Sequence, residues 1–257
     1  MPVTIHPTAA VHPKARLGAD VQIGPGAVVA ERVEIGDRTR IGPHVVVEDW
    51  TVIGEENRIF TGAILGSEAQ DKKYKGQRAF LRVGHRNTIR EYTTFNRATG
   101  EERDTVVGDG NLIMAYAHVA HDCMVGSHNV LANGIAMGGH VTIQEHVTIG
   151  GLCALHQFVR IGSYAMIGGL SRVTKDVPPY IMCAGSPPRI VGINKIGLER
   201  KDFTAEQIRH IEHAYRILYR SKQNVSMALT RLEEETPHEE VRPFIAFIKS
   251  SSRGISK

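Results

Sequence analysis

The stretch VQIGPGAVVAERVEIGDRTRIGPHVVVEDWTVIG, residues 21–54, places an aliphatic residue at every sixth position. The next residue is often glycine, and a small or β-branched residue stands four positions after the aliphatic one. Two inward-pointing residues in every six, joined by a short strand and a corner, are typical of a parallel β-helix. The period therefore predicts a mainly β protein.

The same register extends in both directions from this stretch. Aliphatic residues or phenylalanine occupy Ile5, Val11, Leu17, Ile59, Leu65, Val83, Ile89, Phe95, Val107, Ile113, Val119, Val125, Leu131, Met137, Ile143, Ile149, Leu155, Ile161, Ile167 and Val173. The pattern resembles the left-handed β-helix of the hexapeptide acyltransferases, and the expected handedness comes from that resemblance. Three hexads make one coil of about 18 residues, and equivalent residues of successive coils stack about 4.8 Å apart.

Composition sets the broad class. The chain has 257 residues, of which 42% are hydrophobic and 6% aromatic, so the core is aliphatic. The net charge of +4 is too small to indicate a nucleic-acid partner, although it suits an acidic substrate or protein. No apolar run or leader-like start is apparent, so we expect a cytoplasmic protein without stable membrane insertion. The three cysteines lie in the small inward column and are expected to be free core residues.

The expected organisation has three parts. They are a β-helix over residues 1–180 with insertions at about 67–82 and 97–106, a connecting segment over 181–197, and an α-helical domain over 198–257. Thr204 and Gln207 read as a capping box that opens a helix of about 18 residues. Thr236 with Glu239 reads as the cap of a last helix, with Pro237 in its first turn.

The coil length brings polar residues to one corner. Residues 120–122, 138–140 and 156–158 occupy the same corner on three consecutive coils, so Asp122 is expected beside His140 and Gly139 directly above His121. Gly66, where the first insertion leaves, stands three lengths of about 18 residues before Ala120. Function is usually carried on such loops, so this corner is the candidate site.

A metal is one interpretation of the HxxH spacing of His118 and His121. Hexapeptide-repeat carbonic anhydrases bind zinc between subunits through histidines. The helical reasoning behind HExxH motifs does not transfer, because these residues lie on a strand and a corner. We therefore expect no metal, and a trimeric zinc hydratase remains an alternative.

Longer motifs carry a closer resemblance. HVAHDC (118–123), GGHVTI (138–143), LHQFVRIG (155–162), DVPPY (176–180) and RHIEHAYRILYRS (209–221) resemble the UDP-N-acetylglucosamine acyltransferases of lipid A synthesis. The resemblance implies transfer of an R-3-hydroxyacyl chain from acyl carrier protein to the 3-OH of UDP-N-acetylglucosamine, without a cofactor. It also implies a homotrimer with active sites between subunits. The sister N-acyltransferase is an alternative, although it carries a further domain before the prism, whereas this repeat begins at residue 3.

The resemblance also implies roles for single residues. His121 would be the general base, Asp122 its orienting carboxylate, and the Gly139 N–H the oxyanion donor. In the family, a bulky residue near the position of Gly169 shortens the acyl pocket. Because Gly169 has no side chain, the resemblance predicts a long acyl pocket. The residues expected to bind substrate are Asp71, Lys73, His118, His140, His156, Gln157, Asn194 and Arg200. Ile196 departs from the family's pattern in the uridine-binding segment.

Overall fold

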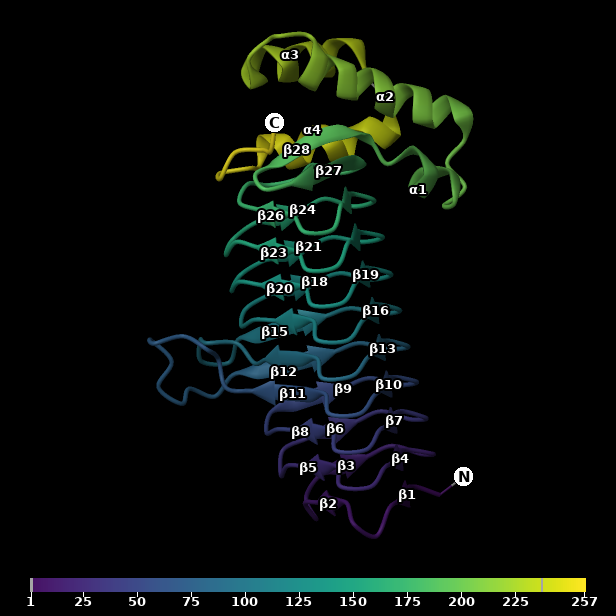
Figure 1. Ribbon diagram of the computed structural model, residues 1–257, viewed down its shortest axis with the longest axis vertical. Helices are drawn as coiled ribbons and strands as arrows, with labels where there is room; N and C mark the ends of the chain where they lie inside the picture. The colour runs from purple at the N-terminus through teal and green to yellow at the C-terminus, as the bar shows by residue number, and fades with distance from the viewer. Residues whose placement is uncertain (1, 237) are drawn as a thin grey trace.

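The computed structural model describes residues 2–236 and 238–257. Three sheets of very short strands form the sides of a tall prism (Figure 1). Sheet A contains β1 (Thr4–Ile5), β4 (Gln22–Ile23), β7 (Arg40–Ile41), β10 (Arg58–Ile59), β13 (Thr88–Ile89), β16 (Leu112–Ile113), β19 (Val130–Leu131), β22 (Thr148–Ile149), β25 (Met166–Ile167), β27 (Ile181–Gly185) and β28 (Pro188–Ile193). Sheet B contains β2 (Ala10–Val11), β5 (Val28–Val29), β8 (Val46–Val47), β11 (Ile64–Ser67), β14 (Thr94–Asn96), β17 (His118–Val119), β20 (Ala136–Met137), β23 (Ala154–Leu155) and β26 (Arg172–Val173). Sheet C contains β3 (Arg16–Leu17), β6 (Glu34–Ile35), β9 (Thr51–Ile53), β12 (Phe80–Val83), β15 (Asp104–Val107), β18 (Met124–Val125), β21 (Thr142–Ile143) and β24 (Arg160–Ile161).

The register confirms the six-residue period. Thr4 pairs with Gln22, and Gln22 with Arg40, so each strand lies in parallel above the equivalent strand of the previous coil. The aliphatic columns point inward, and Leu65 and Ile113 have no exposed surface. The chain is a left-handed parallel β-helix, as expected.

The two insertions leave from the B–C corner, between β11 and β12 and between β14 and β15, and project from one side of the prism (Figure 1). Ile64 pairs with Thr94, and Thr94 pairs with His118. Gly66 therefore lies two coils before Ala120, and our expectation of three coils was wrong. The reason is that the inserted residues together add as much chain as one full coil.

The three cysteines are free and buried, as predicted. Burial raises the pKa of the Cys123 thiol to about 12, and the pKa of Cys183 likewise to about 12. At neutral pH these thiols stay protonated, so they act as small apolar core residues.

The upper end of the prism is closed by a hairpin and by the end of the chain. Residues 181–197 include β27, which pairs in parallel with β25, and β28, which pairs antiparallel with β27. The C-terminus returns to the same end, where Ser256 N donates to Asp176 O over 2.8 Å. The last coil is thus covered rather than open.

In the described part of the chain, four α-helices and a 3₁₀ helix lie at this end (Figure 1). They are α1 (Lys195–Glu199), α2 (Ala205–Arg220), α3 (Val225–Glu235), η1 (Glu239–Val241) and α4 (Arg242–Lys249). The capping box of Thr204 and Gln207 at α2 is confirmed. Within residues 2–236 and 238–257, no helix combines the length and the apolarity needed to cross a membrane.

The expectation for Thr236 was wrong. Thr236 ends α3, and its hydroxyl donates to the Leu232 carbonyl, whereas the last helix starts later at Arg242 with Pro243 in its first turn. Threonine often bonds to the carbonyl four residues earlier in a helix, and this bond competes with an N-cap role. The proposed first-turn Pro237 lies outside the described residues. Helix α3 itself was not predicted.

Candidate active site

The candidate site lies on the B–C corner directly after β17. Asp122 and His140 occupy equivalent positions on consecutive coils, with φ angles of 58° and 61°. This left-handed conformation turns the chain from sheet B to sheet C and directs each side chain outward. His140 N donates to His121 O over 3.1 Å, which holds the two coils in the predicted register.

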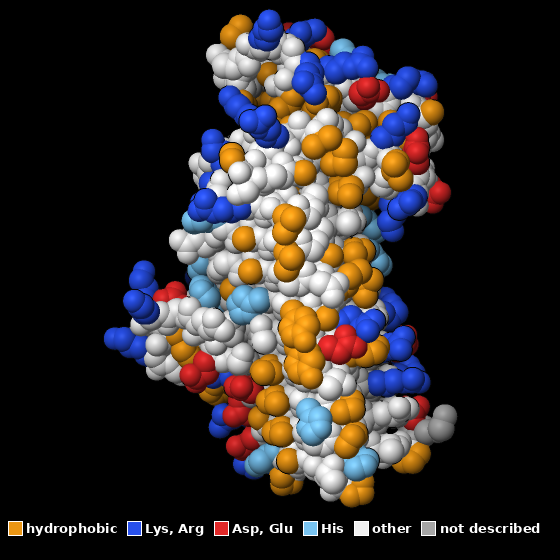
Figure 2. Space-filling model, in the orientation of Figure 1, with side chains coloured by type: hydrophobic (Ala, Val, Ile, Leu, Met, Phe, Trp, Pro, Cys, Tyr) orange, Lys and Arg blue, Asp and Glu red, His pale blue; other side chains and the backbone are white. Residues whose placement is uncertain are grey.

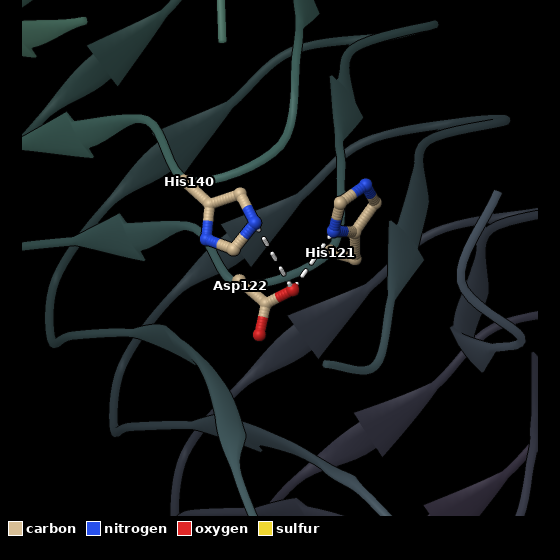
Figure 3. A group of neighbouring side chains, drawn as sticks. All are labelled: His121, Asp122 and His140. Atoms are coloured by element: carbon tan, nitrogen blue, oxygen red, sulfur yellow. Dashed lines mark hydrogen bonds and ion pairs between the residues drawn. The ribbon is translucent and has the colours of Figure 1, made fainter. Parts of the chain in front are cut away.

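His121 and Asp122 form a hydrogen-bonded pair. The Nδ1 atom of His121 lies 2.8 Å from Oδ2 of Asp122, and Nε2 faces away from the carboxylate (Figure 3). His121 is only 9% exposed, so its ring is held in one orientation. With Nδ1 as the donor to the carboxylate, Nε2 carries the free lone pair that a general base needs.

Asp122 is held by residues that the sequence did not single out. Thr99 Oγ1 donates to Asp122 Oδ2 over 2.7 Å, and Asp122 N donates to Thr105 Oγ1 over 2.8 Å. Burial alone would raise the pKa of Asp122, but hydrogen bonds from His121 and Thr99 outweigh it and lower the pKa below its usual value. The carboxylate is therefore ionised at neutral pH.

Gly139 stands against the face of His121, as the coil length predicted. A Cβ atom at Gly139 would lie 2.4 Å from Cε1 of the His121 ring. Any side chain here would displace the imidazole. The glycine therefore allows the ring and the backbone to approach each other closely.

The other histidines of the corner differ in their environments. His118 Nδ1 lies 2.7 Å from Thr94 Oγ1, and burial followed by the neighbouring His121 lowers the pKa of His118. His140 stacks on Phe158, with ring centroids 4.6 Å apart, and its Nε2 lies 3.7 Å from Asp122 Oδ2. His118 is therefore held neutral, while the ring of His140 is fixed by stacking.

The first insertion returns to the same place. Asp71 Oδ2 lies 4.0 Å from Nε2 of His121, and Asp71 Oδ1 accepts a 2.8 Å hydrogen bond from Lys73 N. The Lys73 side chain is exposed. A second carboxylate thus stands near the free nitrogen of the histidine, beside a cation that can reach a ligand.

His156 and Gln157 lie one coil beyond His140 and are exposed. His156 Nδ1 accepts from Arg253 Nη2 over 2.8 Å, so the C-terminal segment holds this histidine in place. The sequence offered no signal for Arg253, because its position depends on the return of the chain end.

Asn194 and Arg200 lie elsewhere, against sheet A. Asn194 caps α1 and donates from Nδ2 to Tyr164 O over 2.9 Å. It borders a hollow of about 510 Å³, which Arg200 and Met166 also line. Within one chain these two residues and the His121 corner stand on opposite sides of the prism.

Gly169 lies on the third part of the surface, the A–B corner. A Cβ atom there would lie 3.3 Å from Gly151 O, and the neighbouring Leu170 is 71% exposed. The corner therefore combines a bare backbone with an exposed apolar side chain.

His121, Asp122 and His140 can each offer one ligand atom, and these three atoms lie within 4.8 Å of one another, close enough to hold a metal ion. His118, the other half of the HxxH spacing, is outside this group and bonds to Thr94. A hydrogen-bonded His–Asp pair equally serves proton transfer, so the geometry permits both kinds of chemistry.

Known proteins resemble this chain closely. A family profile described as "Udp N-acetylglucosamine O-acyltransferase; Domain 2" matches residues 176–256, and one described as "Bacterial transferase hexapeptide (six repeats)" matches residues 14–49 and 104–134. An acyl-[acyl-carrier-protein]–UDP-N-acetylglucosamine O-acyltransferase of Thiobacillus denitrificans is 44% identical over 254 residues, which cover 98% of each chain. The corresponding protein of Synechocystis is 47% identical over 76% of this chain and 70% of its own length.

Solved structures agree with these matches. LpxA from Acinetobacter baumannii superposes with a TM-score of 0.95 at 40% identity, covering 98% of this chain and 99% of its own. LpxA of Bacteroides fragilis, a UDP-N-acetylglucosamine acyltransferase, superposes with a TM-score of 0.96 at 40% identity, covering 99% of this chain and all of its own. The chain belongs to the UDP-N-acetylglucosamine acyltransferase family.

Proposed function

We propose that the protein transfers an R-3-hydroxyacyl chain from acyl carrier protein to the 3-OH of UDP-N-acetylglucosamine. The observation that carries the proposal is the His121–Asp122 pair, with Nε2 free and with bare Gly139 against the ring. The family membership supports the choice of substrates. The test is an assay of purified protein with acyl carrier proteins of graded chain length. Absence of the O-acylated sugar nucleotide with every donor would contradict the proposal.

The reaction needs one base and one oxyanion donor. His121 Nε2 removes the proton of the 3-OH as the oxygen attacks the thioester carbonyl, while Asp122 stabilises the imidazolium through Nδ1. The Gly139 N–H stabilises the tetrahedral oxyanion. Collapse breaks the C–S bond, and the proton passes from His121 to the leaving thiolate of the carrier protein.

The neighbouring side chains position the substrates. Asp71 and Lys73 come from the first insertion and contact the sugar nucleotide. His118 and His140 flank the base, and His156 and Gln157 extend the same corner to the next coil. Their common edge supports this assignment.

We further propose that a neighbouring copy completes the site in a homotrimer. The predicted contacts to uridine and phosphate, Asn194 and Arg200, lie against sheet A, whereas His121 lies on the B–C corner opposite it. One chain cannot bring these groups to a single ligand, but a second chain can. Arginine suits a diphosphate because of its forked donors.

Mixing tests the shared site directly. His121→Ala and Arg200→Ala should each be impaired as pure proteins, and refolded mixtures should regain part of the activity, because some interfaces then contain both intact halves. A fully active monomer in sedimentation velocity would contradict the shared site.

The helical end is proposed to receive the acidic carrier protein. Lys and Arg side chains gather over it (Figure 2), and α1, α2 and the residues between them carry Lys195, Arg200, Lys201, Arg209, Arg216 and Arg220. A positive surface attracts an acidic partner and raises the association rate. Part of this charge is paired, since Arg216 Nη2 lies 2.7 Å from Glu212 Oε1.

A further inference from the structure

Arg97 is a buried arginine in the second insertion, with 5% of its surface exposed. Its guanidinium points toward the first insertion. Nη1 donates to Gly66 O over 2.9 Å, Nε donates to Tyr74 Oη over 3.1 Å, and Nη2 donates to Glu68 Oε1 over 3.2 Å. Burying a cation is costly unless it is paired. These three hydrogen-bond acceptors belong to the loop that carries Asp71 or to the strand end before it, and Glu48 Oε2, of the coil that precedes this strand, adds an ion pair at 3.8 Å from Nη1.

Aromatic rings complete the setting of this guanidinium. The Cζ atom of Arg97 lies 5.3 Å from the ring centroid of Trp50 and 5.8 Å from that of Tyr74. Arginine stacks on such faces while donating in its own plane, which an ammonium cannot do. Arg97 therefore joins the prism, through Trp50, to the middle of the first insertion, through Tyr74.

The backbone around Arg97 holds both ends of that insertion. Arg97 N donates to Ser67 O over 3.0 Å, and Ala98 N donates to Phe80 O over 3.2 Å. Asn96 Nδ2 adds a 2.8 Å hydrogen bond to Glu68 O. Residues 96–98 are thus bonded to the loop where it leaves the prism and where it returns.

The next residue faces the catalytic pair. Thr99 Oγ1 donates to Asp122 Oδ2, the same oxygen that His121 Nδ1 contacts. Thr99 N lies 3.3 Å from that oxygen as well. Residues 96–99 therefore contact the first insertion on one side and the Asp122 carboxylate on the other.

We propose that the turn 96–99 is a brace that places Asp71 and Asp122 on the two sides of the His121 ring. Arg97 positions the loop of Asp71, which lies 4.0 Å from Nε2, and Thr99 positions Asp122 at Nδ1. Neither residue touches the substrate in this proposal. The brace proposal rests on the proposed acyl transfer. It also assigns a role to the second insertion, which interrupts the six-residue repeat.

The proposal predicts that variants in the two halves of the brace change different kinetic parameters. Arg97→Lys should raise KM for UDP-N-acetylglucosamine about tenfold with kcat within about twofold, because it loosens a substrate-binding loop. Thr99→Val should lower kcat about tenfold with KM within about twofold, because it frees the carboxylate that orients the base. Thr99→Ser, which keeps the hydroxyl, should behave like the native protein.

The matched controls are Arg103→Lys, an exposed arginine of the same insertion, and Thr142→Val, a half-buried threonine of β21 in sheet C. Both should leave kcat and KM unchanged. A uniform loss in both brace variants, or no loss in either, would overturn the proposal.

Hydrogen exchange gives a readout that does not need activity. In Arg97→Lys the amides of Lys73 and Tyr74, both bonded to Asp71, should exchange at least about tenfold faster, whereas Thr99→Val should leave them unchanged. If the native protein transfers no acyl group, the proposed reaction fails while the exchange result still decides on the brace. Unchanged exchange in Arg97→Lys would refute it.

Discussion

The B–C and C–A corners of the prism both carry ladders of rings at residues with positive φ. On the C–A corner His128 stacks on His146, with centroids 5.0 Å apart, and His146 stacks on Tyr164 at 4.9 Å. On the B–C corner His140 stacks on Phe158 at 4.6 Å. The repeat alone therefore stacks aromatic and histidine rings on either corner.

The difference between the corners lies in what surrounds the rings. On the B–C corner a buried imidazole faces a carboxylate on one side and bare Gly139 on the other, and both insertions leave from this corner. On the C–A corner the rings face one another. Stacked histidine rings alone therefore do not indicate a catalytic site. The B–C corner is a candidate catalytic site because a carboxylate, a glycine and the two inserted loops surround its buried histidine.

The largest effect is expected at Gly139, whose close contact with His121 distinguishes the B–C corner from the C–A corner. Gly139→Ala places a methyl group 2.4 Å from the His121 ring, so the base must move. We expect kcat to fall about 10³-fold, from the combined loss of base and oxyanion geometry. The measurement is single-turnover acyl transfer, with circular dichroism to show that the fold persists. Retention of more than a tenth of the native rate would contradict close contact between ring and backbone.

Asp122→Asn should have the next largest effect. The amide cannot stabilise an imidazolium at Nδ1, so we expect kcat to fall about 10²-fold with KM little changed. Asp122 has a lowered pKa, so it is already ionised well below neutral pH. Steady-state kinetics should therefore show a similar deficit at every pH between about 6 and 9. A deficit that vanishes at one end of that range would indicate a different role.

Gly169→Met should change the choice of donor rather than the chemistry. A methionine on the A–B corner fills space beside exposed Leu170, so we expect the preference for long over short acyl donors to fall about tenfold. Competition between two acyl carrier proteins in one tube measures this ratio. Equal ratios for the native and variant proteins would show that Gly169 does not line the acyl site.

The C–A corner should affect stability more than activity. Burial, with Lys201 and His128 nearby, lowers the pKa of His146, while Glu145 opposes this shift. A histidine whose pKa is lowered in the folded state binds fewer protons than the unfolded chain, so stability falls as the pH drops below about 6.5. His146→Gln should reduce this loss, which melting curves between pH 7.5 and 5.5 would reveal. An identical pH dependence of Tm in both proteins would contradict it.

The smallest effect is expected from metal removal. The proposed acyl transfer by the His121–Asp122 pair needs proton transfer alone, so treatment with a strong chelator should leave kcat unchanged. His121, Asp122 and His140 could hold a metal ion, which makes the experiment informative. Loss of acyl transfer that zinc restores would contradict the metal-free proton transfer proposed for this site.

The repeat made much of the fold and the corner predictable. A strict coil length places Gly139 against His121 and His140 beside Asp122, and the structure has both contacts. The period fails where chain is inserted, since the path of a loop follows from its own contacts. The coil count at Gly66 and the hydrogen bond of Thr99 could not be predicted for this reason.

The helical end was harder to predict. The capping box at Thr204 is a local signal and was found. Thr236 carried a similar signal but bonds backward to the preceding helix. Arg253 reaches His156 only because the chain end folds back on the prism, which no spacing in the sequence encodes.

The most direct test of the contrast between the corners compares His121→Ala with His146→Ala in one single-turnover assay of acyl transfer. Removing a general base costs about 10²-fold to 10⁴-fold, so His121→Ala should fall by at least that lower bound. His146→Ala should stay within about twofold of the native rate, since stacking alone contributes little to the reaction. Undiminished transfer by His121→Ala, or an equal loss in both variants, would contradict His121 as the base.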